Sequence, residues 1–141
     1  MIPKYRAWHI IDKKMISWKR LLNGHNLRNV FMRPEMCNLK LMQSTGLKDK
    51  NGVEIFEGDI VLITHKSTNY ADTYWHSYAE VFRAKNGAYR IRGEHIYETE
   101  LYSNRKQLTV AGNIYNSPEL LKRERFMTTT ENPELLGDEQ R

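Results

Sequence analysis

Short apolar stretches divided by polar clusters make up most of the chain, and the longest apolar runs are of strand length. Runs of β-prone residues between clusters of Asn, Gly, Asp and Lys are typical of strands joined by turns. Because Leu and Met favour a helix as well as a strand, one stretch, residues 39–43, leaves both open. We predict strands at residues 5–11, 15–21, 27–32, 39–43, 53–56, 60–63, 79–84, 88–92, 95–102 and 107–115.

Turn signals arrange several of these strands into hairpins. The polar trio Asp12-Lys13-Lys14 predicts a hairpin near the N-terminus, and the pair Asn86-Gly87 predicts a second one. Asn51-Gly52 indicates another tight turn. The apolar run at residues 60–63 predicts a strand that is buried on both faces, so we expect its neighbours to form the core.

Residues 64–78 are polar with interleaved aromatic side chains and no clear period, which predicts a long loop. We expect its aromatic side chains either to contact a partner or to fold back over the core as a lid. These candidates are Tyr70, Tyr74, Trp75 and Tyr78.

Beyond residue 115, the order Asn116-Ser117-Pro118-Glu119 is typical of a helix start, and it predicts a short helix over residues 117–126. Residues 127–141 are predicted to be a loose tail. The tail contains Asn-Pro-Glu-Leu-Leu at residues 132–136, which repeats the phrase that begins the helix.

The chain has 141 residues, 40% of them hydrophobic, which is enough for one domain with a single core. No apolar run is long enough to span a membrane. A single cysteine, Cys37, cannot form an internal disulfide, and the N-terminus lacks the features of a secretory signal. We therefore expect a cytoplasmic protein.

Basic residues are concentrated at the N-terminal end. Residues 1–40 hold nine Lys or Arg against two acidic residues, whereas residues 41–141 hold thirteen against fifteen. Clustered cations favour a polyanionic partner, since neutralising phosphates releases counterions. The alternative is an ordinary solvated surface. The candidate phosphate contacts are Lys13, Lys14, Lys19, Arg20, Arg28 and Arg33.

Residue patterns for catalysis or cofactor binding are absent from the sequence. The five histidines lack zinc-site spacing, and neither a phosphate-binding loop nor a Gly-x-Ser-x-Gly motif occurs. We therefore expect no enzyme, no metal, no cofactor and no small-molecule substrate. His65, Asp72 and His76 share the predicted loop and are the place to look for chemistry, together with Asp59, for which we expect a backbone-capping role.

Three segments carry a family resemblance: KYRAW at residues 4–8, LMQSTGLKDKNGVEIFEGDIV at residues 41–61, and VAGNIYNSPELL at residues 110–121. Together they resemble the YopX family of phage and prophage proteins. The resemblance implies a phage or prophage origin, a bacterial cytoplasm and a mostly β fold with a barrel in its second half. It implies no activity and no site residues. Ser117 and the chain beyond Phe126 depart from the family pattern.

The expected fold is mainly β in one domain, residues 1–126. It comprises N-terminal hairpins over residues 1–45, a small SH3-like barrel over 46–116 and the helix, followed by the tail. The leading functional hypothesis is a non-enzymatic module that binds a host or phage macromolecule, by its barrel surface or loop. A nucleic-acid-binding protein is the second hypothesis and an enzyme the third. A protein partner or self-association through strand edges fits all three.

Overall fold

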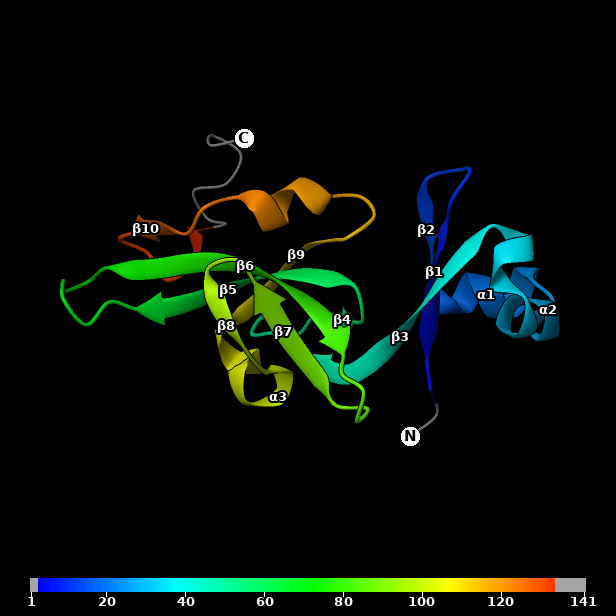
Figure 1. The fold of residues 1–141 in the computed structure, drawn as a ribbon, viewed down its shortest axis with the longest axis horizontal. Helices are drawn as coiled ribbons and strands as arrows, with labels where there is room; N and C mark the ends of the chain where they lie inside the picture. Colours follow the sequence, from blue (N-terminus) through cyan, green and yellow to red (C-terminus); the bar gives the residue numbers. More distant parts are fainter. Residues whose placement is uncertain (1–2, 134–141) are drawn as a thin grey trace.

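The computed structural model describes residues 3–133 as two sheets with short helices, which confirms the mainly β fold (Figure 1). We name residues 3–45 the N-terminal lobe and residues 46–133 the second lobe. The first sheet has the strand order β2-β1-β3-β4. Its strands are β1 (Tyr5–His9), β2 (Lys14–Ile16), β3 (Leu39–Lys48) and β4 (Glu54–Phe56).

The second sheet has the strand order β8-β7-β6-β5-β9 and packs against its own core. A further strand, β10, pairs with β6. The likeness to SH3 barrels and the single-domain organisation stay predictions. The bounds are β5 (Asp59–Lys66), β6 (Tyr74–Arg83), β7 (Tyr89–Gly93), β8 (Ile96–Glu100), β9 (Leu108–Asn113) and β10 (Phe126–Thr128).

Two hydrophobic clusters are buried among the described residues, one in each lobe. The cluster of the second lobe centres on β5, whose residues 60–63 are buried as predicted. That of the N-terminal lobe lies between the first sheet and two helices, α1 (Trp18–Gly24) and α2 (Leu27–Met32). In Figure 1 these helices cover the face of β1 and β3 that points away from the second lobe.

The helices α1 and α2 correct two strand predictions, at residues 15–21 and 27–32. The second strand ends at Ile16, and Ser17 begins α1 by accepting a hydrogen bond from the backbone of Arg20. Asn26 caps α2 in the same way. The apolar side chains point into the core at helical spacing, so Leu21 and Val30 are buried. The short 3-10 helix Pro34–Cys37 then leads into β3, which settles residues 39–43 as strand.

The predicted loop at residues 64–78 is wrong. These residues form the end of β5 and the start of β6, which pair from Ile60↔Glu80 to Lys66↔Tyr74, so only residues 67–73 form the turn. The sequence lacks the alternation of apolar and polar residues that is typical of a strand, because several buried positions here are polar. They include Thr64, His76 and Ser77. The other hairpins, β1–β2 and β6–β7, are confirmed.

The C-terminal segment differs from its prediction in two ways. The helix is a single 3-10 stretch, Pro118–Lys122, and part of the predicted loose tail is β10. Most of the strand predicted at 95–102 is β8, which is followed by the helix α3 (Leu101–Asn104) and the 3-10 helix Arg105–Gln107. Most of the repeated phrase at residues 132–136 lies outside the described residues.

Within residues 3–133, no helix is both long enough and apolar enough to cross a membrane.

Candidate functional site

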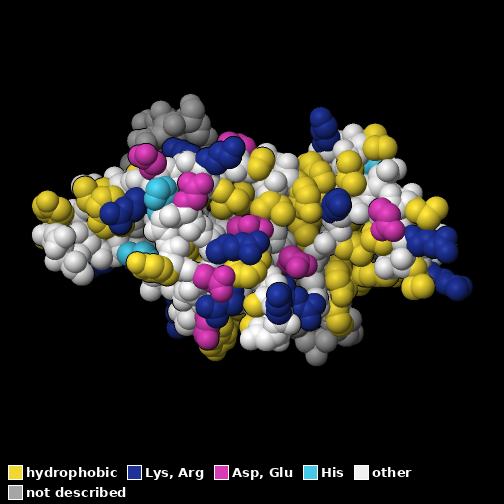
Figure 2. Space-filling model, viewed as in Figure 1, with side chains coloured by type: hydrophobic (Ala, Val, Ile, Leu, Met, Phe, Trp, Pro, Cys, Tyr) yellow, Lys and Arg dark blue, Asp and Glu magenta, His cyan; other side chains and the backbone are white. Residues whose placement is uncertain are grey.

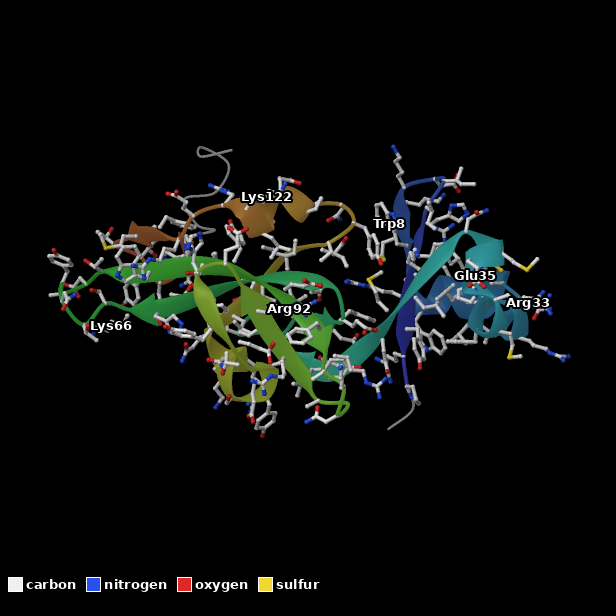
Figure 3. All side chains as sticks on the ribbon, viewed as in Figure 1. Trp8, Arg33, Glu35, Lys66, Arg92 and Lys122 are labelled. Atoms are coloured by element: carbon white, nitrogen blue, oxygen red, sulfur yellow. The ribbon has the colours of Figure 1, made fainter. Side chains whose placement is uncertain are left out.

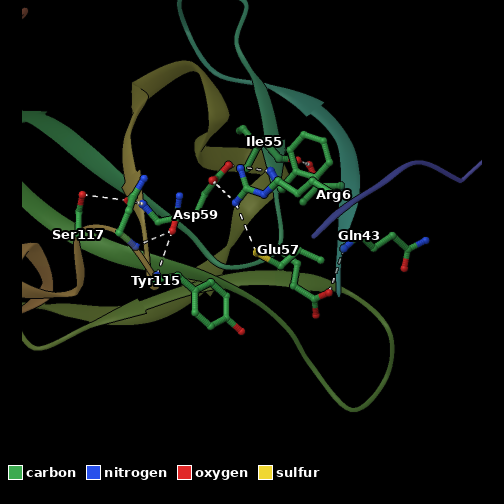
Figure 4. A network of polar contacts seen from close by, with 12 residues as sticks. Arg6, Gln43, Ile55, Glu57, Asp59, Tyr115 and Ser117 are labelled. Carbon is green, nitrogen blue, oxygen red and sulfur yellow. Dashed lines mark hydrogen bonds and ion pairs between the residues drawn. The ribbon is translucent and has the colours of Figure 1, made fainter. Parts of the chain in front are cut away.

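The three segments that resemble the YopX family meet at the junction of the two lobes. Arg6 of β1 reaches across to Asp59 at the start of β5, with 2.6 Å between Nη2 and Oδ1 (Figure 4). The other carboxylate oxygen of Asp59 accepts the backbone N–H of Phe56 at 2.7 Å. Asp59 thus caps the backbone, as expected, and also holds the N-terminal lobe.

This ion pair is almost shut off from water, since the side chain of Asp59 is 1% exposed and that of Arg6 is 14% exposed. Burial raises the pKa of the Asp59 carboxyl above its ordinary value of 3.8, and the Arg6 guanidinium offsets that rise only in part. Among residues 3–133, the buried Nε of Arg6 has no hydrogen-bond partner, so its charge depends on Asp59 for compensation.

The third segment, residues 110–121, makes further contacts at the same junction. The rings of Trp8 and Tyr115 stack with centroids 5.7 Å apart and planes at 12°. The backbone N–H of Ile114 donates to the carbonyl of Gly58 at 2.9 Å. Gly58 has a φ of +86°, and a Cβ there would lie 3.0 Å from the sulfur of Met42. The motif residues therefore join the lobes.

A cleft of about 340 Å³ lies beside this junction, lined by residues of β3, β6, β7 and the segment after β9. Its charged groups largely neutralise one another, since Arg92 lies 3.5 Å from Glu80 and stacks 4.0 Å over Phe82. Burial raises the pKa of the Tyr115 phenol at its rim, and Glu57 and Glu80 raise it further. The cleft thus offers a protonated phenol and balanced charges.

The four residues proposed for chemistry are not brought together. His65 and His76 lie on opposite faces of the β5–β6 hairpin, because His76 pairs with Thr64. His76 is buried, with Nδ1 2.9 Å from the Thr64 hydroxyl and Nε2 2.6 Å from the Thr128 hydroxyl. Asp72 is exposed in the turn. Over the described part of the chain, no cluster of His, Cys, Asp or Glu could hold a metal ion.

Three of the four aromatic candidates pack within the fold and are not free surface groups. Tyr74, Trp75 and Tyr78 are half-buried on β6, and the C-terminal segment covers two of them. Arg125 stacks 4.3 Å over Trp75, and Arg123 lies 5.7 Å over Tyr78. Only Tyr70 of the four is exposed, at 62%, in the turn of the hairpin.

The six basic candidates all lie exposed on the N-terminal lobe. They come from the β1–β2 turn (Lys13), from the start of β2 (Lys14), from α1 (Lys19, Arg20), from α2 (Arg28) and from the residue after it (Arg33). Figure 2 shows dark blue side chains over this end of the molecule, interleaved with yellow apolar ones, and Figure 3 places Arg33 at its tip.

The acidic residues of the N-terminal lobe leave this basic surface unneutralised. The lobe holds only Asp12 and Glu35, and Asp12 lies 3.7 Å from His9. None of the six basic candidates forms an ion pair with any residue from 3 to 133.

An aromatic cluster on this lobe was missed by the sequence reasoning. The rings of Tyr5, Trp18 and Phe31 contact one another on the helix-covered face of the first sheet. Two of the three stood in predicted strands that are helices. The capping residues Ser17 and Asn26 were the signal that could have located them.

Comparison with known proteins agrees with the motifs. The model of the family described as YopX protein matches residues 4–122. Among solved structures, protein EF1440 from Enterococcus faecalis is similar, with 29% sequence identity and a TM-score of 0.56, and the match covers 86% of this chain and 99% of that one. No curated protein matches. Because the family model spans most of the sequence, the chain belongs to the YopX family.

Proposed function

We propose that this YopX-family protein is a non-enzymatic interaction module that binds nucleic acid through the basic surface of its N-terminal lobe. The observation that carries this proposal is the set of six exposed Lys and Arg side chains without ion-pair partners among residues 3–133. Free cations on a surface with few carboxylates are suited to neutralising phosphates, and counterion release then favours binding.

The other hypotheses have less support. A partner site at the predicted loop loses most of its aromatic surface, because Trp75 and Tyr78 lie under arginines and only Tyr70 stays exposed. The hypothesis of an enzyme centred on the histidines has no structural support, because the four candidate residues lie apart from one another. A phage or prophage origin, a place in the bacterial cytoplasm and self-association remain parts of the proposal.

Two variants of equal charge test it. In the N-lobe variant, Lys13, Lys14, Lys19 and Arg20 are changed to Gln. In the matched control, Lys66, Lys85, Lys106 and Lys122 of the second lobe are changed to Gln; these side chains are also exposed. Figure 3 labels Lys66 and Lys122, which lie far from α1 and α2.

Fluorescence anisotropy with labelled single-stranded and double-stranded oligonucleotides at low salt then measures the affinities. We expect the N-lobe variant to bind about tenfold more weakly or worse, while the control stays within a few-fold of wild type. Equal losses in both variants would show only an effect of net charge. Absence of binding by the wild-type protein would end the proposal and leave a protein partner as the alternative.

A further inference from the structure

The cluster of Tyr5, Trp18 and Phe31 is a surface feature as well as a packing contact. Tyr5 lies 4.9 Å from Phe31 and 6.0 Å from Trp18 between ring centroids, and Trp18 lies 6.4 Å from Phe31. Trp18 packs against the core of the lobe, but Phe31 is 39% exposed. The core therefore holds the cluster in place while part of an aromatic ring faces solvent.

Cations and further apolar side chains belong to the two helices that carry Trp18 and Phe31. Arg28 precedes Phe31 by three residues on α2, so the two side chains lie on neighbouring positions of one helix face. Lys19 follows Trp18 on α1. Leu22 of α1 is 47% exposed and Met32 of α2 is 72% exposed. The two helices thus combine a rigid aromatic cluster with cations that form no ion pair among residues 3–133.

We propose that this aromatic cluster stacks on unpaired bases, so that the N-terminal lobe prefers single-stranded nucleic acid to duplex. The proposal rests on the nucleic-acid-binding function proposed above and deepens it. An aromatic face accepts any unpaired base, and nearby Lys or Arg side chains follow the phosphates. In a duplex the bases are stacked on one another, so only the phosphates remain available to this surface.

The test separates stacking from charge by using probes with and without bases. The probes are labelled oligothymidylate, oligouridylate, an abasic strand of the same length, and duplex DNA. The variant Phe31→Leu removes the aromatic face but keeps an apolar side chain in contact with Tyr5 and Trp18. Tyr97→Leu is the control, because Tyr97 is 96% exposed on β8 of the second lobe. Near-ultraviolet circular dichroism checks that both variants fold.

We expect wild-type protein to bind a base-containing strand more tightly than the abasic strand. Phe31→Leu should weaken binding to the base-containing strand by about fivefold or more, and leave abasic binding unchanged. Tyr97→Leu should change neither.

Four results would overturn it. Equal affinity for the abasic and base-containing strands, or tighter binding of duplex, would leave the proposed function intact and remove stacking. A dimer in sedimentation equilibrium that Phe31→Leu dissociates, without any dependence on bases, would assign the cluster to a second copy of the chain. Failure to bind any probe, including the abasic strand, would remove the proposed function itself.

Discussion

At the scale of single residues, the pair of Arg6 and Asp59 decides how the lobes are held. Its two charges come from segments 53 residues apart; Asp59 is buried and Arg6 is mostly so. A buried ion pair recovers its desolvation cost only while both partners are present. The loss of one partner therefore matters far more than the loss of a surface pair.

We predict that Arg6→Gln lowers the free energy of unfolding by about 3 kcal/mol, because it leaves the Asp59 carboxylate buried without its counterion. Urea denaturation at neutral pH measures the loss. The matched control is Glu98→Gln, which breaks the exposed pair with Arg90 and should cost less than about 1 kcal/mol. Equal effects of the two substitutions would contradict the structural role of the junction.

A second prediction at this scale follows from the raised pKa of the Asp59 carboxyl. Because the folded state holds the proton of this carboxyl more tightly than the unfolded chain does, the group stabilises the protein more as the pH falls. The added stability is complete below the ordinary pKa of 3.8 and is lost as the pH rises through the folded-state pKa.

The free energy of unfolding of wild type, taken relative to Asp59→Asn, should therefore increase as the pH is lowered toward that ordinary value. Urea denaturation over a series of acidic buffers measures this difference. A relative stability that decreases toward acid would mean that Arg6 outweighs burial and lowers the pKa instead.

At the scale of elements, β10 pairs with β6, and a polar side-chain contact adds to that pairing. The Thr128 hydroxyl donates to the carbonyl of Thr130 at 2.6 Å, so it accepts the Nε2–H of His76. The ring of Phe126 lies 5.0 Å from that of His76. This strand extends the sheet along the edge of β6, beside residues 74–76.

We predict that Thr128→Val, which keeps the shape but removes the hydroxyl, destabilises the protein by about 1 kcal/mol. It should also speed amide hydrogen exchange in β10. Thr129→Val changes an exposed neighbour and is the control. If both variants unfold at the same denaturant concentration as wild type, the contact contributes nothing to docking of the strand.

Several elements could be predicted because their signals were local. Asn86-Gly87 marks a turn in which Gly87 has a φ of +89°, and the apolar run of β5 leaves no solvent-facing side. The helices α1 and α2 were missed because each has six or seven residues, too few for a helical period to stand out. Their β-branched and aromatic residues resemble those of a strand.

Part of the candidate site could also be predicted, because its signal is local in the sequence. Charge is visible in sequence, so the six basic residues could be named and prove to be exposed together on one lobe. The aromatic cluster and the contact of Arg6 with Asp59 arise from long-range packing, which no local pattern encodes. His76 looked like a loop residue because its partners, Thr64 and Thr128, come from other strands.

At the scale of the whole molecule, the two lobes share the strand β3, and the contacts of the junction add to it. Residues 39–43 of this strand pair with β1, and its later residues pair with β4. The stack of Trp8 on Tyr115 adds a contact from the edge of the first sheet. The N-terminal lobe thus carries the proposed binding surface, and the second lobe supports it.

We predict that Trp8→Ala loosens this coupling. Amides of β1 and β2 should exchange with solvent faster, while those of β5 and β6 keep wild-type protection. Hydrogen exchange followed by mass spectrometry measures both groups in one experiment. Tyr97→Ala, far from the junction, provides the reference, and a uniform change across both lobes would contradict a local role for Trp8.

The most direct test of the central claim is the salt dependence of nucleic-acid affinity for wild type, the N-lobe variant and its matched control. Each phosphate contact contributes about 0.7 to 0.9 to the slope of log affinity against log salt concentration. The account predicts a steep slope for wild type, the same slope for the control, and a shallower one for the N-lobe variant. A wild-type affinity that is indifferent to salt, or equal slopes for all three proteins, would contradict binding through this lobe.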